Sequence, residues 1–247
     1  HQDGHSHLIA STIPNLKAYD PAYSYEIAVI IYDGIKRMYK DGQDIFYYIT
    51  LENENYKQPP MPNNIEEGII KGMYLLKSTG NGKNKVQLLA SGSMLNETLE
   101  ASKLLKTDWG IDSDVWSVTS YSELHKEAED KKRWNTLHPE KDDLQSYIGS
   151  KLNINNNPVV AISDYVKLVA EQIAPYINCS FSALGTDGFG RSETREELRT
   201  FFEVNRYYIV MNAMESLRGL NLVKQSEVKK VIETYNLDTE KPNPIKV

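Results

Sequence analysis

Short apolar runs alternate with helical apolar stripes along most of this chain, and residues 85–106 show the pattern most clearly. Residues 86–90 form a short apolar run, which is typical of a strand covered on both faces. A Ser91-Gly92-Ser93 turn follows, and Ser93 is expected to cap a helix whose apolar side carries Leu95, Leu99 and Leu105. With a strand at 114–119, this pattern predicts a β-α-β unit and a parallel sheet.

Further apolar runs predict strands at residues 45–50, 159–162 and 181–184. Helical spacing predicts a helix ending at Tyr39, with Asp20 as its cap, although the β-branched run 27–31 leaves a strand open there. Other helices are expected at 65–77, at 166–177 after a cap at Asp164, from Ser192, at 207–219 and from Ser226. The expected fold is therefore α/β: three αβα layers around a mostly parallel sheet.

Three polar stretches interrupt this pattern. Residues 53–64, rich in proline and asparagine, are expected to form a loop, and the charged segment 121–147 is expected to be irregular, with 126–133 as a solvated face. The Gly- and Asn-rich stretch 78–84 suggests a domain boundary. We therefore predict domains at 1–80 and 81–247.

Composition narrows the functional classes. The 247 residues are 40% hydrophobic and 25% charged, as in ordinary globular proteins, and the net charge of −6 argues against a nucleic-acid surface. No apolar run approaches the roughly 18 residues of a membrane helix. Cys179 is the only cysteine, so no internal disulfide forms, which fits a reducing, cytoplasmic location. Because the chain opens on His1 and not on methionine, we expect a partial chain.

The first seven residues hold the densest group of candidate catalytic side chains. His1, Asp3, His5 and His7 could transfer protons or bind substrate, because histidine titrates near neutral pH. The same four side chains could bind a metal ion, as in a metal-dependent hydrolase. They could also belong to a frayed terminus or a tag remnant, and composition alone does not decide among these three interpretations.

Two glycine-containing turns lie between a strand and a helix. The turn at 91–93 could bind phosphate at a helix N-terminus but lacks the glycine spacing and lysine of known phosphate loops. The Gly185–Ser192 loop could bind an anion, or it could simply require unusual backbone angles, with Asp187 and Arg191 paired or at an interface. His138, in a charged segment, is expected to be solvated or to anchor its loop.

Several motifs together resemble one family. His1 to His7 is similar to the His-x-Asp-Gly-His-Ser-His loop of homodimeric pyruvate dehydrogenases, the first component of the pyruvate dehydrogenase complex. The other matching motifs are Thr12-Ile13-Pro14-Asn15, Tyr19-Asp20-Pro21-Ala22-Tyr23, Asn53-Glu54-Asn55-Tyr56, Arg133-Trp134-Asn135, Leu137-His138-Pro139 and residues 87–93, 113–120 and 184–192.

The resemblance implies that residues 1–80 end a pyrimidine-binding domain and that 81–247 form a transketolase-like C-terminal domain. It implies catalytic roles for His1 and His5, substrate binding by Asp3 and His7, and the partners pyruvate, a lipoyl acyltransferase and a second copy in a homodimer. The complete enzyme would use thiamine diphosphate and Mg²⁺. No Gly-Asp-Gly…Asn motif for that cofactor occurs here, so we expect this chain alone to bind none and to be inactive. The alternatives are a non-catalytic α/β assembly module and the metal-dependent hydrolase.

Overall fold

A five-stranded sheet is the centre of the molecule in the computed structural model, which describes residues 3–82 and 84–247. Its order is β3-β5-β4-β6-β7, and all neighbours are parallel except the edge strand β3, which runs antiparallel to β5. The bounds are β3 Met73–Ser78, β4 Lys85–Ala90, β5 Asp112–Val118, β6 Val159–Ile162 and β7 Phe181–Leu184. The strands predicted near 86–90, 114–119, 159–162 and 181–184 are therefore confirmed.

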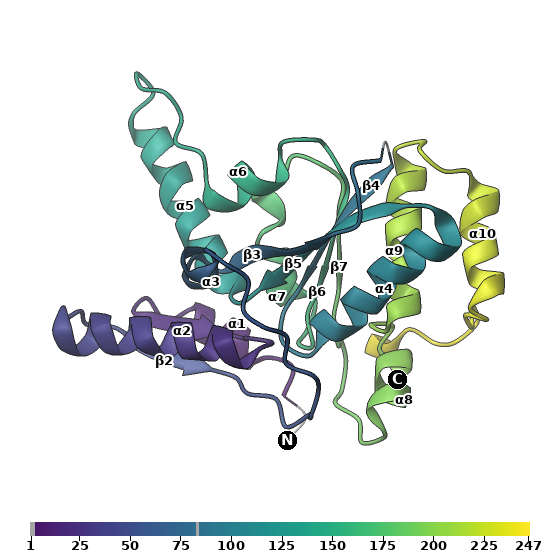
Figure 1. Cartoon of the computed structure of the whole chain (residues 1–247), viewed down its shortest axis with the longest axis horizontal. Helices are drawn as coiled ribbons and strands as arrows, with labels where there is room; N and C mark the ends of the chain where they lie inside the picture. Colours follow the sequence, from purple (N-terminus) through teal and green to yellow (C-terminus); the bar gives the residue numbers. More distant parts are fainter. Residues whose placement is uncertain (1–2, 83) are drawn as a thin grey trace.

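Helices cover both faces of this sheet, so the predicted three-layer αβα fold is confirmed (Figure 1). Leu88 and Val115 pack with one helical layer, whereas Leu89 and Trp116 face the other, because successive side chains alternate along a strand. The first layer consists of α4 Met94–Trp109, α9 Arg206–Gly219 and α10 Gln225–Thr234. The second consists of α5 Tyr121–Leu137, α6 Tyr147–Leu152 and α7 Leu168–Glu171.

The N-terminal part forms a smaller α/β unit beside the main sheet (Figure 1). Two parallel strands, β1 Leu16–Tyr19 and β2 Phe46–Ile49, pair with each other. The helices around them are α1 Ser6–Ser11, α2 Ser24–Ile35, the π-helical turn η1 Lys36–Lys40 and α3 Glu66–Lys71. The helix interpretation of the segment ending near Tyr39 is therefore confirmed over the strand, as is the predicted strand at 45–50.

Buried hydrogen bonds join this unit to the main sheet. The amide of Asp20 donates to the carbonyl of Thr119 at 2.8 Å, and the hydroxyl of Ser120 donates to the carbonyl of Ala18 at 2.6 Å. Glu26 lies at the junction and accepts hydrogen bonds from Tyr74 and Ser117 at 2.7 and 2.6 Å. The division of domains at residue 80 stays a prediction, and β3, which precedes it, is nevertheless an edge strand of the main sheet.

Two predicted elements were wrong. Segment 121–147 is irregular only over residues 138–146, because residues 121–137 form α5, whose N-cap Ser120 accepts a hydrogen bond from the amide of Glu123. Lys126 in this helix is not part of a solvated face, since its ammonium donates to the carbonyls of Ile13 and Leu16 at 3.3 and 2.8 Å. The helix predicted at 65–77 ends at Gly72, whose φ of +108° is left-handed, and continues as β3.

Four predicted caps were also wrong. Asp20 does not cap α2, whose N-cap is Tyr23, and Asp164 does not cap α7, whose N-cap is Lys167. Ser93 stands at the N-cap of α4 but makes no capping hydrogen bond, because its hydroxyl donates to Asp164 at 3.3 Å. The cap of α8, Arg195–Phe201, is Thr194 and not Ser192, since Thr194 accepts from the amide of Glu197. The side chains of Asp20, Ser93 and Asp164 have partners in other segments and do not cap their own helices.

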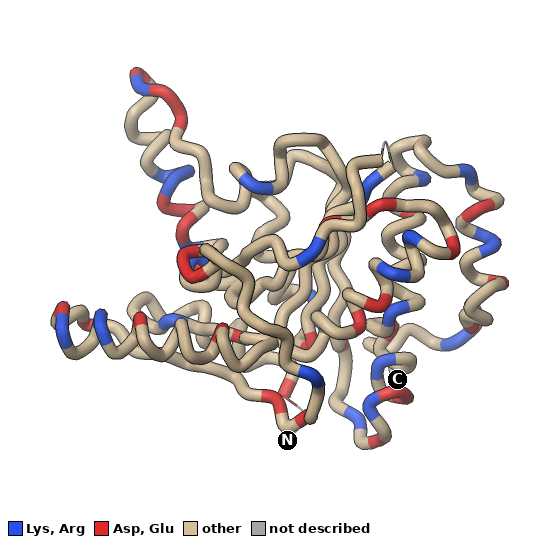
Figure 2. The backbone as a smooth tube through the Cα atoms, in the orientation of Figure 1, with Lys and Arg blue, Asp and Glu red and all other residues tan. Residues whose placement is uncertain are grey.

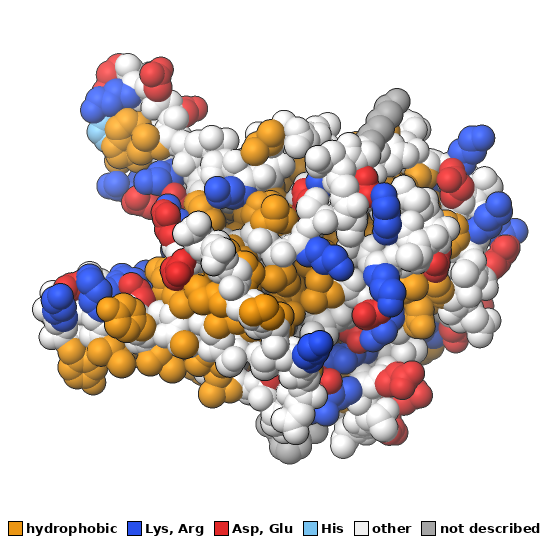
Figure 3. Space-filling view, viewed as in Figure 1, with side chains coloured by type: hydrophobic (Ala, Val, Ile, Leu, Met, Phe, Trp, Pro, Cys, Tyr) orange, Lys and Arg blue, Asp and Glu red, His pale blue; other side chains and the backbone are white. Residues whose placement is uncertain are grey.

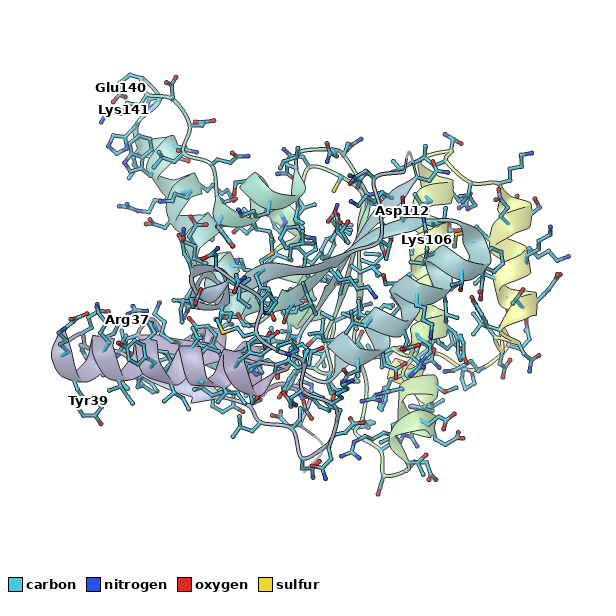
Figure 4. The ribbon with its side chains drawn as sticks, in the orientation of Figure 1. Arg37, Tyr39, Lys106, Asp112, Glu140 and Lys141 are labelled. Carbon is cyan, nitrogen blue, oxygen red and sulfur yellow. The ribbon has the colours of Figure 1, made fainter. Side chains whose placement is uncertain are left out.

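Charge and apolar surface are unevenly distributed. The long helix α5 and the loop that follows it, with Glu140 and Lys141 at its tip, project from the body and carry many charges of both signs (Figures 2 and 4). The free end of α2 and η1 presents exposed apolar side chains, including Tyr32 and Tyr39 at 75% and 82% exposure (Figures 3 and 4). No helix in the described residues has the length and apolar character needed to cross a membrane.

Candidate functional site

The N-terminal loop is held in a defined turn. The carboxylate of Asp3 accepts hydrogen bonds from the amides of His5 and Ser6, both at 3.0 Å, and thereby orders the start of α1. The carbonyl of Gly4 accepts from the amide of Val166 at 3.0 Å, which ties the loop to the connection after β6. The loop is therefore fixed at the carboxyl ends of the main-sheet strands, where open α/β sheets commonly bind ligands.

This loop and the Gly185–Ser192 loop together line a cavity of about 380 Å³. Asp3, Gly4 and His5 from the first loop and Thr186 and Arg191 from the second contribute to its lining. Asp164, at the end of β6, also lines it. Two sequence features that lie about 180 residues apart, and that sequence reasoning treated separately, thus form one candidate site.

The Gly185–Ser192 loop is shaped by close backbone approaches. A Cβ on Gly185 would lie 2.2 Å from the amide nitrogen of Lys167, so only glycine fits, and Gly188 has a φ of +103°. Asp187 accepts from the amide of Lys167 at 3.0 Å and does not pair with Arg191, whose guanidinium lies 5.0 Å from the centre of the Phe201 ring. The interpretation as a turn with unusual backbone angles is confirmed, and Arg191 adds a positive charge to the cavity.

The ionisation of Asp3 is set by opposing effects. Burial opposes its charge, but hydrogen bonds from Ser6 and His5 and the nearby His7 outweigh burial and lower the pKa of the Asp3 carboxyl. Asp3 is therefore an anion at neutral pH. Burial and the charge of Asp20 raise the pKa of the Asp164 carboxyl, which also lines the cavity.

The predicted site residues lie in different environments. Asp3 and His5 are exposed at the cavity, whereas His7 is only 5% exposed and does not line it. The Nε2 atom of His7 lies 3.1 Å from the hydroxyl oxygen of Thr50, and the rings of Tyr48 and Tyr165 contact its imidazole edge-on. His1 lies outside the described residues. The catalytic and substrate-binding roles of all four residues stay predictions.

The Ser91-Gly92-Ser93 turn, a candidate phosphate site in the sequence, binds the carboxylate of Asp20 instead. The carboxylate of Asp20 accepts from the hydroxyl of Ser91 at 2.7 Å, and the carbonyl of Asp20 accepts from the amide of Gly92 at 3.0 Å. A negative charge at the N-terminus of α4 is favourable, and Asp20 supplies it. This arrangement argues against an external phosphate in the turn.

Sequence reasoning missed Glu52, which lies beside this turn. More than a third of its surface is exposed, yet partial burial and the carboxylates of Asp20, Asp164 and Glu54 raise the pKa of Glu52 to about 7. No sequence spacing would have identified it, because these carboxylates come from distant segments. Glu52 is thus a titratable group near the candidate site.

The other histidines have local partners. The His138 ring stacks on Trp134 with centroids 4.4 Å apart, and its Nδ1 lies 2.8 Å from the Trp134 carbonyl, so it anchors its loop. His125 lies on α5, where its Nδ1 contacts the carbonyl of Gln172 at 3.1 Å. Within 3–82 and 84–247, no three His, Cys, Asp or Glu side chains are grouped to hold a metal ion. The described residues therefore give the hydrolase alternative no ligand set.

Comparison with known proteins assigns the fold to a family. A model of the transketolase-like C-terminal domain matches residues 72–205, more than half of the chain. The chain belongs to the family of transketolase-like C-terminal domains. A model of the middle domain of pyruvate dehydrogenase E1 components matches residues 1–59.

Curated relatives of this transketolase-like chain are pyruvate dehydrogenase E1 components. The chain is 51% identical over 247 residues to that of Pseudomonas aeruginosa and 48% identical over 246 residues to that of Escherichia coli K12. Each alignment includes 99% of this chain but 28% of the relative, so the chain spans about a quarter of their length. The resemblance stated from the motifs is confirmed.

Solved structures share the fold at low identity. Transketolase from Pichia stipitis superposes with a TM-score of 0.65 at 18% identity, over 90% of this chain and 28% of that chain. Transketolase from Leishmania mexicana gives 0.62 at 20% identity, over 88% and 28%. A structure named "Split gene transketolase, inactive beta4 tetramer" gives 0.60 at 17% identity, over 88% and 63%.

Proposed function

We propose that this chain forms the rim of the active site in a pyruvate dehydrogenase E1 enzyme. That enzyme would decarboxylate pyruvate on thiamine diphosphate and reductively acetylate the lipoyl group of an acyltransferase. One observation carries the proposal: the Asp3–His7 loop and the Gly185–Ser192 loop line one cavity in a chain about half identical to E1 components.

The residues of this chain would bind and orient substrate and move protons. Asp3 is an anion that orders the loop and keeps its second carboxylate oxygen available at the cavity. His5, exposed there, would donate or accept a proton, and His1 would share this role. Arg191 would attract the carboxylate of pyruvate. His7 was predicted to bind substrate, and its burial suggests that it acts by supporting the loop.

The described residues do not fit thiamine diphosphate and Mg²⁺ as a complete site. The sequence lacks a Gly-Asp-Gly…Asn motif, and no metal-holding group occurs in the part that the structure describes. We therefore assign no step of the reaction to cofactor atoms on this chain. In our proposal, other parts of the complete enzyme hold the cofactor, and this chain alone is inactive.

The proposed partners follow from the same assignment. Pyruvate is the substrate, a lipoyl acyltransferase accepts the acetyl group, and a second copy completes a homodimer in the cytoplasm. The non-catalytic assembly module stays the second candidate, because one structure of similar fold is named an inactive β4 tetramer. Those two functions differ in whether cavity residues affect turnover.

The test uses the natural polypeptide that contains this chain. It should release CO₂ from pyruvate when supplied with thiamine diphosphate and Mg²⁺, and Asp3→Asn should lower kcat/KM by at least about tenfold. Asp142→Asn is the control, because Asp142 is exposed in the loop after α5 and does not line the cavity. Undiminished kcat/KM in the Asp3 variant would favour the assembly module.

A further inference from the structure

A continuous series of hydrogen bonds links the start of α4 to His7. The hydroxyl of Ser91 donates to one carboxylate oxygen of Asp20 at 2.7 Å. The hydroxyl of Thr50 donates to the other oxygen, also at 2.7 Å. The Nε2 atom of His7 lies 3.1 Å from the same Thr50 oxygen. Residues from four separate segments therefore meet in one buried polar network.

The network determines where His7 carries its proton. The Thr50 hydroxyl has a single hydrogen, and both of its acceptors, the Asp20 carboxylate at 2.7 Å and the Tyr19 carbonyl at 3.3 Å, have none to give back. The Thr50 hydrogen is thus committed, so Thr50 can only accept from His7. Because only Nε2 faces Thr50, the proton of neutral His7 lies on Nε2, and Nδ1 is left as an acceptor.

Asp20 is fixed firmly enough to orient this series. Its backbone amide donates to Thr119 and its carbonyl accepts from Gly92, at 2.8 and 3.0 Å. The side chain is buried, and the described residues place no Lys, Arg or His within ion-pair distance of it. A buried carboxylate without an ion pair is costly. The hydroxyl groups of Ser91 and Thr50 offset part of that cost and hold the carboxylate in one position.

Two carboxylates, those of Asp20 and Asp3, set the charged surroundings of His7. Burial lowers the pKa of His7, while Asp20 and Asp3 raise it. Tyr48 from β2 and Tyr165 after β6 face the ring without charge and restrict its rotation. Asp20 therefore acts on His7 through both a hydrogen-bond series and its negative charge.

We propose that Asp20 is a positioning residue that acts through Thr50 to fix the His7 imidazole with its proton on Nε2. The consequence for catalysis rests on the proposed function, because His7 belongs to the loop whose Asp3 and His5 line the cavity. The tautomer itself depends only on the contacts of this chain.

Nitrogen NMR of the 247-residue chain with ¹⁵N-labelled histidine tests the proposal. The neutral His7 ring should show a hydrogen coupled to Nε2. Thr50→Ser should keep that signal, whereas Thr50→Val, which keeps the shape but removes the hydroxyl, should speed exchange of this hydrogen about tenfold. Thr107→Val is the matched control, since Thr107 also donates to an aspartate, Asp108, but on the exposed side of α4.

A charge variant supplies a second readout. Asp20→Asn should lower the pKa of His7, because a nearby negative charge that favours the imidazolium is removed. Unchanged signals from His125 and His138 would show that the fold persists. A hydrogen on Nδ1 in the wild-type chain would overturn the proposal, as would exchange in Thr50→Val equal to that in Thr107→Val. Neither readout requires pyruvate, so failure here is distinct from failure of the proposed function.

Discussion

Asp20 and Gly92 lie in direct contact, although they are far apart in the sequence. A Cβ on Gly92 would lie 2.9 Å from both carboxylate oxygens of Asp20, and the φ of Gly92 is +50°. The contact joins the N-terminal unit to the first helix of the main sheet. It also places a negative charge at the N-terminus of α4.

This contact predicts the effect of adding a single methyl group. Gly92→Ala should destabilise the chain through both its left-handed backbone and the clash with Asp20. Gly110→Ala is the control, because Gly110 has a φ of +65° but nothing within 4 Å of its Cβ position. In urea unfolding, Gly92→Ala should lose at least about 1 kcal/mol more than Gly110→Ala, which itself loses roughly 1–2 kcal/mol. Equal losses of unfolding free energy in the two variants would contradict a costly clash between the added methyl group and Asp20.

The strands of the main sheet were predictable because they are buried on both faces, which leaves short apolar runs in the sequence. Helix α5 was missed because only a narrow stripe, Tyr121, Leu124 and Ala128, is buried among many charges. That spacing was the available signal. The edge strand β3 was missed because residues 65–77 were interpreted as one helix interrupted by Gly68 and Gly72. In the structure Gly72 ends α3, and the strand begins at Met73.

The candidate site was predictable only in part. Its two loops were recognised by their motifs, but no spacing rule connects Asp3 with Arg191. Nor does one connect Asp20 with Ser91, because these two residues are 71 positions apart. Asp20, Ser93 and Asp164 each precede a helix or a proline and so resembled caps. Tertiary contacts gave their side chains other partners, and such contacts are not encoded locally.

Glu52 should make stability depend on pH. Its pKa of about 7 in the folded chain exceeds the ordinary value, so between that ordinary value and pH 7 the folded state binds more protons than the unfolded state. The contribution of Glu52 to stability should therefore fall as the pH rises through this window. Glu52→Gln should remove this part of the pH dependence, as measured by urea midpoints at pH 5 and pH 8. Glu240→Gln, an exposed control, should show the wild-type difference in urea midpoint between pH 5 and pH 8. A Glu52→Gln variant with that same difference would refute the raised pKa of Glu52.

The N-terminal unit should be the less stable half of the chain. Its two-stranded sheet leaves strand edges unpaired, and residues 50–64 contain no helix or strand. Limited proteolysis should therefore cut first within residues 1–80, with 53–64 the preferred segment. First cuts inside 85–235 would contradict this order.

Cofactor binding should require more than this chain. With no diphosphate motif in the sequence, isothermal calorimetry of the chain with thiamine diphosphate and Mg²⁺ should show no micromolar binding. The complete enzyme under the same conditions is the positive control. Micromolar binding by the chain alone would overturn our assignment of the cofactor site to other parts of the enzyme.

The most direct test of the active-site assignment is steady-state kinetics of histidine variants in the complete enzyme. A positioned histidine typically contributes about 10²–10⁴-fold to a proton-transfer step, so His1→Ala should lower kcat by at least about tenfold. His5→Ala should also lower it, because His5 lines the cavity. His125→Ala should leave kcat nearly unchanged, since His125 lies on α5 against Gln172. Saturated rates for His1→Ala and His5→Ala equal to that of His125→Ala would contradict a catalytic role for the N-terminal loop.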